Sequence, residues 1–482
     1  MLFNSLSFAI FLPIVFLLYW WIGSKNLKSQ NLLLLASSYF FYACWDWRFL
    51  FLLLFSTLLD YYTGLKMNGS TNPKNRKFWF WLSIIANLGF LGVFKYYNFF
   101  AESFAQGLSG LGLYVSPVTL NIILPVGISF YTFHGLSYVI DIYKKRIPAE
   151  KNFTDYALFV SFFPLLVAGP IERATHLLPQ IKEKRIFNLD NIKDGLRQIL
   201  WGLFKKIVIA DQCAQYANAI FNNSDNLNGS SLAFGALFFT FQMYGDFSGY
   251  SDIAIGTARL FGIDLIRNFA YPYFSRDIAE FYRRWHISLS SWFRDYVYIP
   301  LGGSKVGTLK KIRNIFLIFI ISGFWHGANW TFIAWGTLNA LYFLPLLLTN
   351  SNRNNLEIAA KGKFFPSFRE VTGIVITFGL TAFSRIFFRA ESISHAFSYI
   401  GTLFSESLFY APDFEEKKKA MVLIAVTLLF FLIEWIGREQ QYAIKSLGLT
   451  WKRPVRWACY YVLIAAIILF AGKEQQFIYF QF

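Results

Sequence analysis

Residues 312–348 read IRNIFLIFIISGFWHGANWTFIAWGTLNALYFLPLLL, an apolar stretch that contains Trp325-His326-Gly327. The stretch is long enough to hold two membrane-spanning helices, because one span needs about 20 residues. An imidazole in hydrocarbon surroundings is costly unless a polar group partners it. We therefore predict an integral membrane protein in which His326 has a functional role. A purely structural buried histidine is the alternative.

The composition of the whole chain agrees with a membrane protein. Of its 482 residues, 55% are hydrophobic and only 15% are charged. The formal net charge is +17, but Lys and Arg occur in short clusters between apolar runs, as in cytoplasmic loops. We therefore predict no nucleic-acid partner. Cys44, Cys213 and Cys459 are far apart and lack metal-ligand spacing, so we also expect no metal site.

Apolar segments of helical length recur along the chain. They lie at 6–22, 31–42, 49–62, 78–94, 121–140, 156–167, 192–210, 231–244, 312–348, 374–388, 421–436 and 457–471. This pattern predicts an all-α polytopic membrane protein with roughly 10–12 transmembrane or re-entrant helices. Several segments are too short for a simple span, so we expect them to be re-entrant or buried behind other helices. Such an arrangement favours an enclosed cavity.

A polar block interrupts the apolar residues that precede it. Residues 245–252 read GDFSGYSD and supply two carboxylates, two serine hydroxyls and two glycines. We predict that the backbone breaks there and lines a polar path, with Asp246, Ser248 and Asp252 as candidate substrate-binding residues. A helix cap at the membrane surface is the alternative, because Asp and Ser are good cap residues.

A basic block follows, in which residues 281–303 read FYRRWHISLSSWFRDYVYIPLGG. On one helix, Arg283, His286, Ser290 and Arg294 would share a face. This basic stripe predicts a site for a phosphate-bearing ligand, since Arg offers a planar fork of donors to phosphate oxygens. The alternative is an interfacial amphipathic helix whose arginines meet lipid headgroups.

Small and polar residues surround His326 in the sequence. Gly323 and Gly327 have the small-xxx-small spacing that lets another backbone approach a helix closely. Asn329 follows three residues after the histidine, near the same face of a continuing helix. We therefore add Trp325 and Asn329 to the candidate substrate-binding residues.

Several ordered blocks together resemble the membrane-bound O-acyltransferase (MBOAT) family, and most closely its bacterial alginate O-acetyltransferase branch. The blocks lie at 124–133, 163–173, 245–252, 283–288, 298–303, 325–328 and 477–482. The resemblance covers nearly the whole chain. It implies one integral-membrane domain, 1–482, with a catalytic core at about 120–345 and flanking spans at 1–119 and 346–482. It also implies a ring of helices around a central funnel, with His326 as the signature histidine and His286 as the second catalytic position.

The resemblance further implies a multi-pass protein of the bacterial inner membrane that acts as an O-acyltransferase. An acyl group, acetyl by family likeness, would move from a cytoplasmic thioester such as acetyl-CoA toward an extracytoplasmic polysaccharide. A separate extracytoplasmic acyltransferase of the serine-hydrolase type would complete the transfer, and no tightly bound cofactor is expected.

A mechanism can be written on these residues as a hypothesis. Neutral His326 would accept the proton of an acceptor hydroxyl, while Asn329, Trp330 or backbone amides near Gly327 stabilise the oxyanion. His286, with the two arginines, would position the donor. A covalent acyl-imidazole and a role for Ser322 remain open alternatives.

Two other functions fit parts of the pattern. A glycan or precursor transporter would use Asp246 and Asp252 as a relay, and those carboxylates would then matter more than His326. A related family branch esterifies teichoic acids with D-alanine taken from a carrier protein. The segments at 421–436 and 457–471 favour the alginate-type branch, because D-alanyl members of the family are typically shorter.

Overall fold

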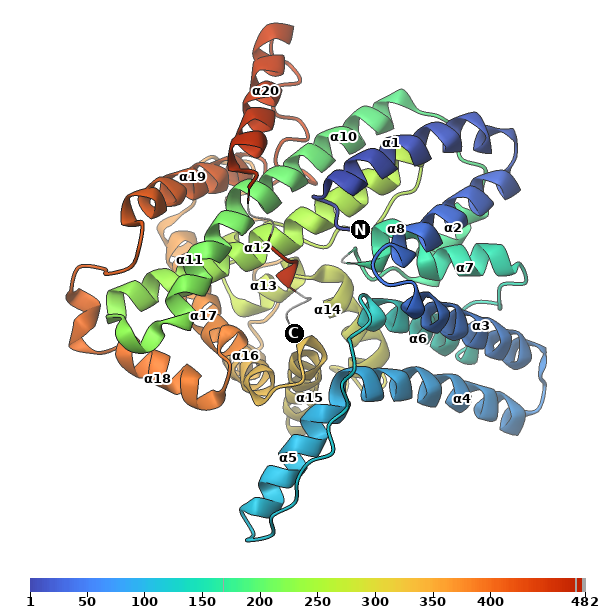
Figure 1. Ribbon diagram of the computed structural model, residues 1–482, viewed down its shortest axis with the longest axis horizontal. Helices are drawn as coiled ribbons and strands as arrows, with labels where there is room; N and C mark the ends of the chain where they lie inside the picture. The colour runs from blue at the N-terminus through green and yellow to red at the C-terminus, as the bar shows by residue number, and fades with distance from the viewer. Residues whose placement is uncertain (168, 473–474, 479–482) are drawn as a thin grey trace. The chain divides into compact units, whose positions relative to one another are not determined.

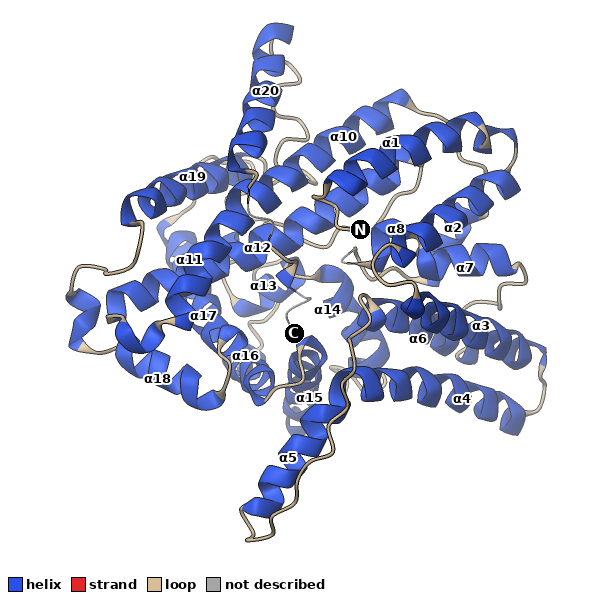
Figure 2. Ribbon diagram, in the orientation of Figure 1, coloured by secondary structure: helices blue, strands red, loops and turns tan. Residues whose placement is uncertain are grey.

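The computed structural model describes residues 1–167, 169–472 and 475–478. Within these residues all regular secondary structure is helical, which confirms the predicted all-α class (Figure 2). The chain forms two compact units, unit 1 (residues 1–192 and 257–266) and unit 2 (residues 193–256 and 267–482). Residue 168 and residues 479–482, which belong to two of the family-like blocks, lie outside the described part.

Unit 1 consists of helices from the first part of the chain. They are α1 (Leu6–Trp21), α2 (Leu27–Ala43), α3 (Arg48–Gly69), α4 (Pro73–Leu91), α5 (Tyr97–Ser109), α6 (Ile128–Tyr143), α7 (Phe153–Ser161), α8 (Phe163–Leu166) and α9 (Ala174–Ile181) (Figure 1). Almost every residue of α6 is buried, and this helix packs against α3 and α4. A helix too short for a simple span is thus covered by its neighbours, as predicted for such segments.

The boundary between the two units falls within the helix α10 (Leu189–Leu203). The remaining helices come after α10 in the sequence. They are α11 (Asp211–Asn222), α12 (Gly229–Leu260), α13 (Ile278–Arg284), α14 (Ile287–Phe293), α15 (Thr308–His326), α16 (Trp330–Leu348), α17 (Phe368–Arg389), α18 (Ile393–Leu403), α19 (Lys417–Ile436) and α20 (Arg453–Phe470). The π-helical turns Phe204–Ala210 and Arg294–Tyr298 follow α10 and α14, respectively.

The polar block at 245–252 lies in the interior of α12, so the predicted break and the alternative helix cap are both wrong. The glycines of this block allow two helices to pack closely and do not mark a backbone break. A Cβ atom on Gly249 would lie 2.8 Å from the carbonyl oxygen of Gly202, and one on Gly202 would lie 2.7 Å from that of Gly249. The two helices therefore touch backbone to backbone, which only glycine permits.

The stretch at 312–348 forms the two helices that its length predicted, α15 and α16, in a closely packed pair. A Cβ on Gly323 would lie 2.2 Å from the carbonyl oxygen of Phe332, so the predicted close approach of another backbone is confirmed. Because α15 ends at His326, Asn329 does not share a helical face with it, and that expectation is wrong. Asn329 instead caps α16 by accepting a hydrogen bond from the amide of Thr331 at 3.0 Å.

Seven segments among the described residues are long and apolar enough to cross a membrane. They are Leu6–Lys25, Arg48–Gly69, Pro73–Ser109, Trp330–Leu348, Phe368–Arg389, Lys417–Ile436 and Arg453–Phe470. The other predicted apolar segments form shorter or more polar helices. The chain is thus a polytopic membrane protein.

Candidate active site

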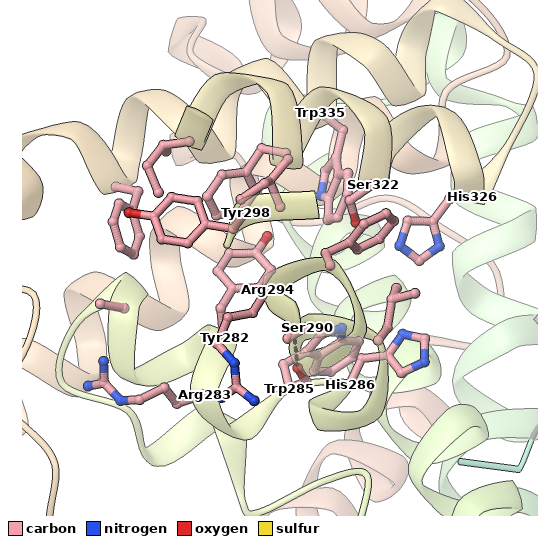
Figure 3. Close-up of a pocket in the computed structure, with 17 residues that line it drawn as sticks. Tyr282, Arg283, Trp285, His286, Ser290, Arg294, Tyr298, Ser322, His326 and Trp335 are labelled. Carbon is pink, nitrogen blue, oxygen red and sulfur yellow. Dashed lines mark hydrogen bonds between the residues drawn. The ribbon is translucent and has the colours of Figure 1, made fainter. Parts of the chain in front are cut away.

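Unit 2 contains a cavity of about 230 Å³ between the α13–α14 region and the α15–α16 pair. Its lining combines apolar and aromatic side chains with a few polar ones. The lining residues are Ala279, Tyr282, Arg283, Trp285, His286, Leu289, Ser290, Phe293, Arg294, Tyr298, Ile315, Ile318, Phe319, Ser322, His326, Trp335 and Phe343. Figure 3 shows His286 and His326 together at one end and Arg283 toward the other. A concave, mostly apolar site with few polar groups is typical of a small-molecule site.

The four residues of the predicted basic stripe all line this cavity, although they do not share one helix. The helix α13 ends at Arg284, and His286 adopts a left-handed conformation with φ 45° before α14 begins at Ile287. Asn268 holds this turn through tertiary contacts: its carbonyl accepts from the Ile287 amide at 2.9 Å, and its side chain accepts from the Ser288 hydroxyl at 3.0 Å. A strained conformation of a non-glycine residue, held by its surroundings, often marks a functional site.

The His286 side chain is buried among aromatic rings. Its ring centroid lies 4.5 Å from that of Phe247 and 6.5 Å from that of His326. Neither ring nitrogen of His286 has a hydrogen-bond partner within the described part of the chain. Burial lowers the pKa of His286 well below its ordinary value, and the neighbouring His326 lowers it further. His286 is therefore neutral at neutral pH, and its ring nitrogens remain available to a ligand.

His326, the last residue of α15, faces the same cavity and is only 4% exposed. The rings of Trp325, Trp335 and Phe388 surround it at centroid distances of 5.0, 5.3 and 5.4 Å. These packed rings fix the position of the imidazole, and an enclosed site of this kind strengthens electrostatic interactions inside it.

The two arginines of the cavity already have protein partners. Arg283 donates to the carbonyl oxygens of Asn352 and Asn355 at 2.9 and 2.8 Å. Arg294 is largely exposed and binds Asp295 at 2.7 Å. Ser290 donates to the carbonyl oxygen of Trp285 at 3.3 Å. A phosphate that entered the cavity would have to share the arginines with these partners.

Two predicted residues near His326 do not line the cavity. Trp325 is buried and contacts both histidine rings, at 6.0 Å from His286 and 5.0 Å from His326. Both polar atoms of the Asn329 amide have partners. Its oxygen caps α16, and its nitrogen donates to the carbonyl oxygen of Glu391 at 3.0 Å. Trp325 is therefore part of the packed wall behind the histidines, and Asn329 is a structural residue.

The predicted carboxylates are also absent from the lining of the histidine cavity and are held in buried ion pairs. The ammonium group of Lys206 lies 2.8 Å from both Asp246 and Asp211, and the second Asp246 oxygen accepts from the amide of Ile478 at 2.8 Å. Lys205 binds Asp252 at 2.5 Å. These pairs give the acids of α12 a structural role, and their predicted role in substrate binding stays a prediction.

The third predicted residue of that block, Ser248, is buried in α12. It lines a separate polar cavity of about 10 Å³ together with Asp252, Lys205 and Glu434. It does not line the histidine cavity. Ser248 therefore belongs to the polar packing around the ion pairs.

Replacing Lys206 by Met tests whether these acids are structural. The change leaves Asp211 and Asp246 buried without their shared cation, which costs about 3–5 kcal/mol when one member of a buried ion pair is removed. We expect a lower apparent melting temperature in detergent and a lower protein level in membranes. The matched control is Lys361→Met, because the Lys361–Glu357 pair is exposed, and it should change neither quantity. Unchanged stability with a complete loss of function would instead support a carboxylate relay.

The sequence analysis missed three residues that border the histidines. Tyr282 and Trp335 line the cavity, and Arg385 lies with them beside His326 in an adjoining cavity of about 10 Å³. Tyr282 and Trp335 looked like ordinary membrane aromatics in the sequence. The intramembrane charge of Arg385, in the span Phe368–Arg389, was the one signal that could have drawn attention to it.

Comparisons with known proteins identify the family of the chain. Residues 143–364, which include both histidines, match the model of the MBOAT, membrane-bound O-acyltransferase family. The chain is 38% identical to the probable alginate O-acetylase AlgI of Pseudomonas putida over 100% of both chains. It is 34% identical to the peptidoglycan O-acetyltransferase of Helicobacter pylori, over 100% of this chain and 98% of that one. A teichoic acid D-alanyltransferase of Bacillus subtilis is 29% identical over 57% of this chain and 71% of its own. The chain belongs to the membrane-bound O-acyltransferase family and is a membrane O-acyltransferase.

Proposed function

We propose that this enzyme moves an acetyl group from a cytoplasmic acyl thioester, such as acetyl-CoA, toward an extracytoplasmic polysaccharide. The observation that carries the proposal is the pair of buried imidazoles, His286 and His326, whose ring centroids lie 6.5 Å apart at the end of one cavity. Full-length relatives named for acetyl transfer to alginate and to peptidoglycan support the acetyl group and the glycan acceptor.

The lining of the cavity suits an acyl thioester. Leu289, Ile315 and Phe319 provide apolar walls for the uncharged arm of a thioester donor, while Arg283 and Arg294 lie where its phosphates would be. In this arrangement the thioester carbonyl reaches the histidines and the charged end of the donor stays at the arginines. The donor is a substrate in this scheme, and no tightly bound cofactor takes part.

The chemistry assigned to the histidines is general base catalysis. Neutral His326 accepts the proton of the acceptor hydroxyl while the acceptor oxygen bonds to the acyl carbon. The carbonyl electron pair moves onto oxygen, and collapse of this intermediate expels the thiolate, which takes up the proton. His286, kept neutral by burial, orients the donor beside His326.

The acceptor side involves a second protein in this proposal. We place the enzyme in the bacterial inner membrane, where a separate extracytoplasmic acyltransferase of the serine-hydrolase type receives the acyl group and completes its transfer to polysaccharide. The family resemblance supports this partner.

The two rival functions have less support. The D-alanyltransferase of Bacillus subtilis matches only 57% of this chain, whereas the two acetyltransferase relatives match 100% of it. A transporter relay would need accessible carboxylates, but Asp246 and Asp252 are buried and paired with Lys206 and Lys205.

Inverted membrane vesicles test the donor directly, because they expose the cytoplasmic face to added substrate. With radiolabelled acetyl-CoA, we expect base-labile acetyl ester inside vesicles that carry the wild-type protein, and none in vesicles with His326→Ala. Transfer of D-alanine from its carrier protein, without acetyl transfer from acetyl-CoA, would contradict the proposal. Label that remains on the protein when no acceptor is present would indicate an acyl-imidazole intermediate.

A further inference from the structure

Tyr282 is an unassigned polar residue in the middle of the histidine cavity (Figure 3). It projects from α13, and its ring packs edge-on against Phe319 with centroids 4.8 Å apart. It lines both the main cavity and the small adjoining cavity that contains His326. Its hydroxyl makes no hydrogen bond to any described residue, so it is available to a ligand in the cavity.

Acyl transfer needs a hydrogen-bond donor at the position where the carbonyl oxygen becomes negatively charged. Asn329, the donor expected from the sequence, is engaged as a helix cap and lies outside the cavity lining. A tyrosine hydroxyl on a packed ring has little freedom to lose and can donate one well-directed hydrogen bond. Tyr282 can therefore donate the hydrogen bond that the sequence led us to expect from Asn329.

Arg385 of α17 lines the same small cavity as Tyr282. It is 3% exposed, and its guanidinium carbon lies 4.5 Å from the ring centroid of Trp285. Nη1 donates to the hydroxyl of Tyr273 and to the carbonyl oxygen of Thr240. No carboxylate among the described residues pairs with it. A buried cation without a counter-ion is costly, and an anion that forms during the reaction would offset that cost.

Tyr282 and Arg385 influence each other electrostatically. Burial raises the pKa of Tyr282 far above its ordinary range, and the charge of Arg385 opposes this rise. The phenol thus keeps its proton at any relevant pH. The nearby guanidinium makes its O–H group a stronger hydrogen-bond donor.

We infer that Tyr282 donates a hydrogen bond to the acyl carbonyl oxygen in the transition state, and that Arg385 is a positioning residue that strengthens this donor. The inference rests on the proposed acyl transfer. As the acceptor oxygen bonds to the acyl carbon and His326 takes its proton, the carbonyl electron pair moves onto the oxygen that faces Tyr282. When the thiolate leaves, that oxygen becomes a neutral carbonyl again and the hydrogen bond weakens.

The test is steady-state kinetics of acetyl transfer in vesicles with Tyr282→Phe, which removes only the hydroxyl. We expect kcat to fall about 100-fold, as for the loss of one oxyanion donor, with an unchanged KM for the thioester. The matched control is Tyr461→Phe on α20, since Tyr461 is exposed and does not line the cavity, and its kinetics should equal those of the wild type. An unchanged kcat for Tyr282→Phe, or a rise in KM alone, would overturn the inference.

The role of Arg385 is tested in the same assay. Arg385→Met should lower kcat about tenfold, and Arg385→Lys should restore most of it, because the ammonium retains the charge. If Arg385 acts through Tyr282, the double variant Tyr282→Phe with Arg385→Met is no slower than Tyr282→Phe alone. Additive losses would exclude this coupling. Activity in His326→Ala would refute the proposed function itself, whereas an inactive His326→Ala with a fully active Tyr282→Phe would refute only this inference.

Discussion

Replacing His326 by Ala is expected to lower acyl transfer by about 1,000-fold or more, because it removes the base that accepts the acceptor's proton. The imidazole is packed against Trp325, Trp335 and Phe388 on the cavity wall, and none of these side chains can act as a base in its place. The measurement is initial velocity of ester formation in vesicles, normalised to the amount of folded protein.

The control for this variant is a histidine outside the cavity. His395, on α18, forms a hydrogen bond with Ser224 at 3.0 Å, and His395→Gln keeps a polar group there. We expect full activity from His395→Gln and a normal protein level from both variants. Residual transfer close to that of the wild type in His326→Ala would exclude His326 as the base.

Replacing His286 by Ala is expected to reduce kcat/KM about 100-fold, since His286 orients the donor next to the base. His286 has φ 45°, where a residue with a Cβ atom is strained by about 1–2 kcal/mol, and Ala keeps this strain while it loses the packing of the imidazole. His286→Gly separates the two effects, because glycine adopts this conformation without strain. The chemical role predicts that kcat/KM stays low in the Gly variant although stability recovers.

Asparagine provides a further comparison at position 286. It tolerates the left-handed conformation and carries a polar amide, so His286→Asn should retain more activity than His286→Gly. Recovery of full activity in His286→Gly would show that the backbone conformation matters and the imidazole does not.

The helices were predicted well because helix length and apolar composition are local signals, whereas the pairing of His286 with His326 came from the family resemblance. The stretch at 312–348 showed its two helices by length, and an imidazole in an apolar run marked His326. Arg283, Ser290 and Arg294 do line one cavity, but the single helix from which this was predicted is interrupted at His286. The turn at His286 could not be predicted from its own segment, because Asn268, which lies outside that segment, holds it in place.

The roles of the acids could not be read from local sequence. Asp246 and Asp252 looked like a polar path because their partners, Lys206 and Lys205, lie some 40 residues away in a segment that read as apolar. Likewise, nothing near Tyr282 in the sequence distinguishes it from a tyrosine of the membrane interface. Tertiary packing decides which polar groups in a membrane protein are paired and which are left for a substrate.

The most direct test of the central claim is the amount of base-labile O-acetyl ester on the cell-surface polysaccharide of strains that carry single variants. At equal membrane levels of protein, the account predicts that ester is lost in His326→Ala and is strongly reduced in His286→Ala. In Asp246→Asn, ester should fall only in proportion to the amount of folded protein. Retention of ester in His326→Ala, together with its loss in Asp246→Asn at a normal protein level, would contradict the account and indicate transport.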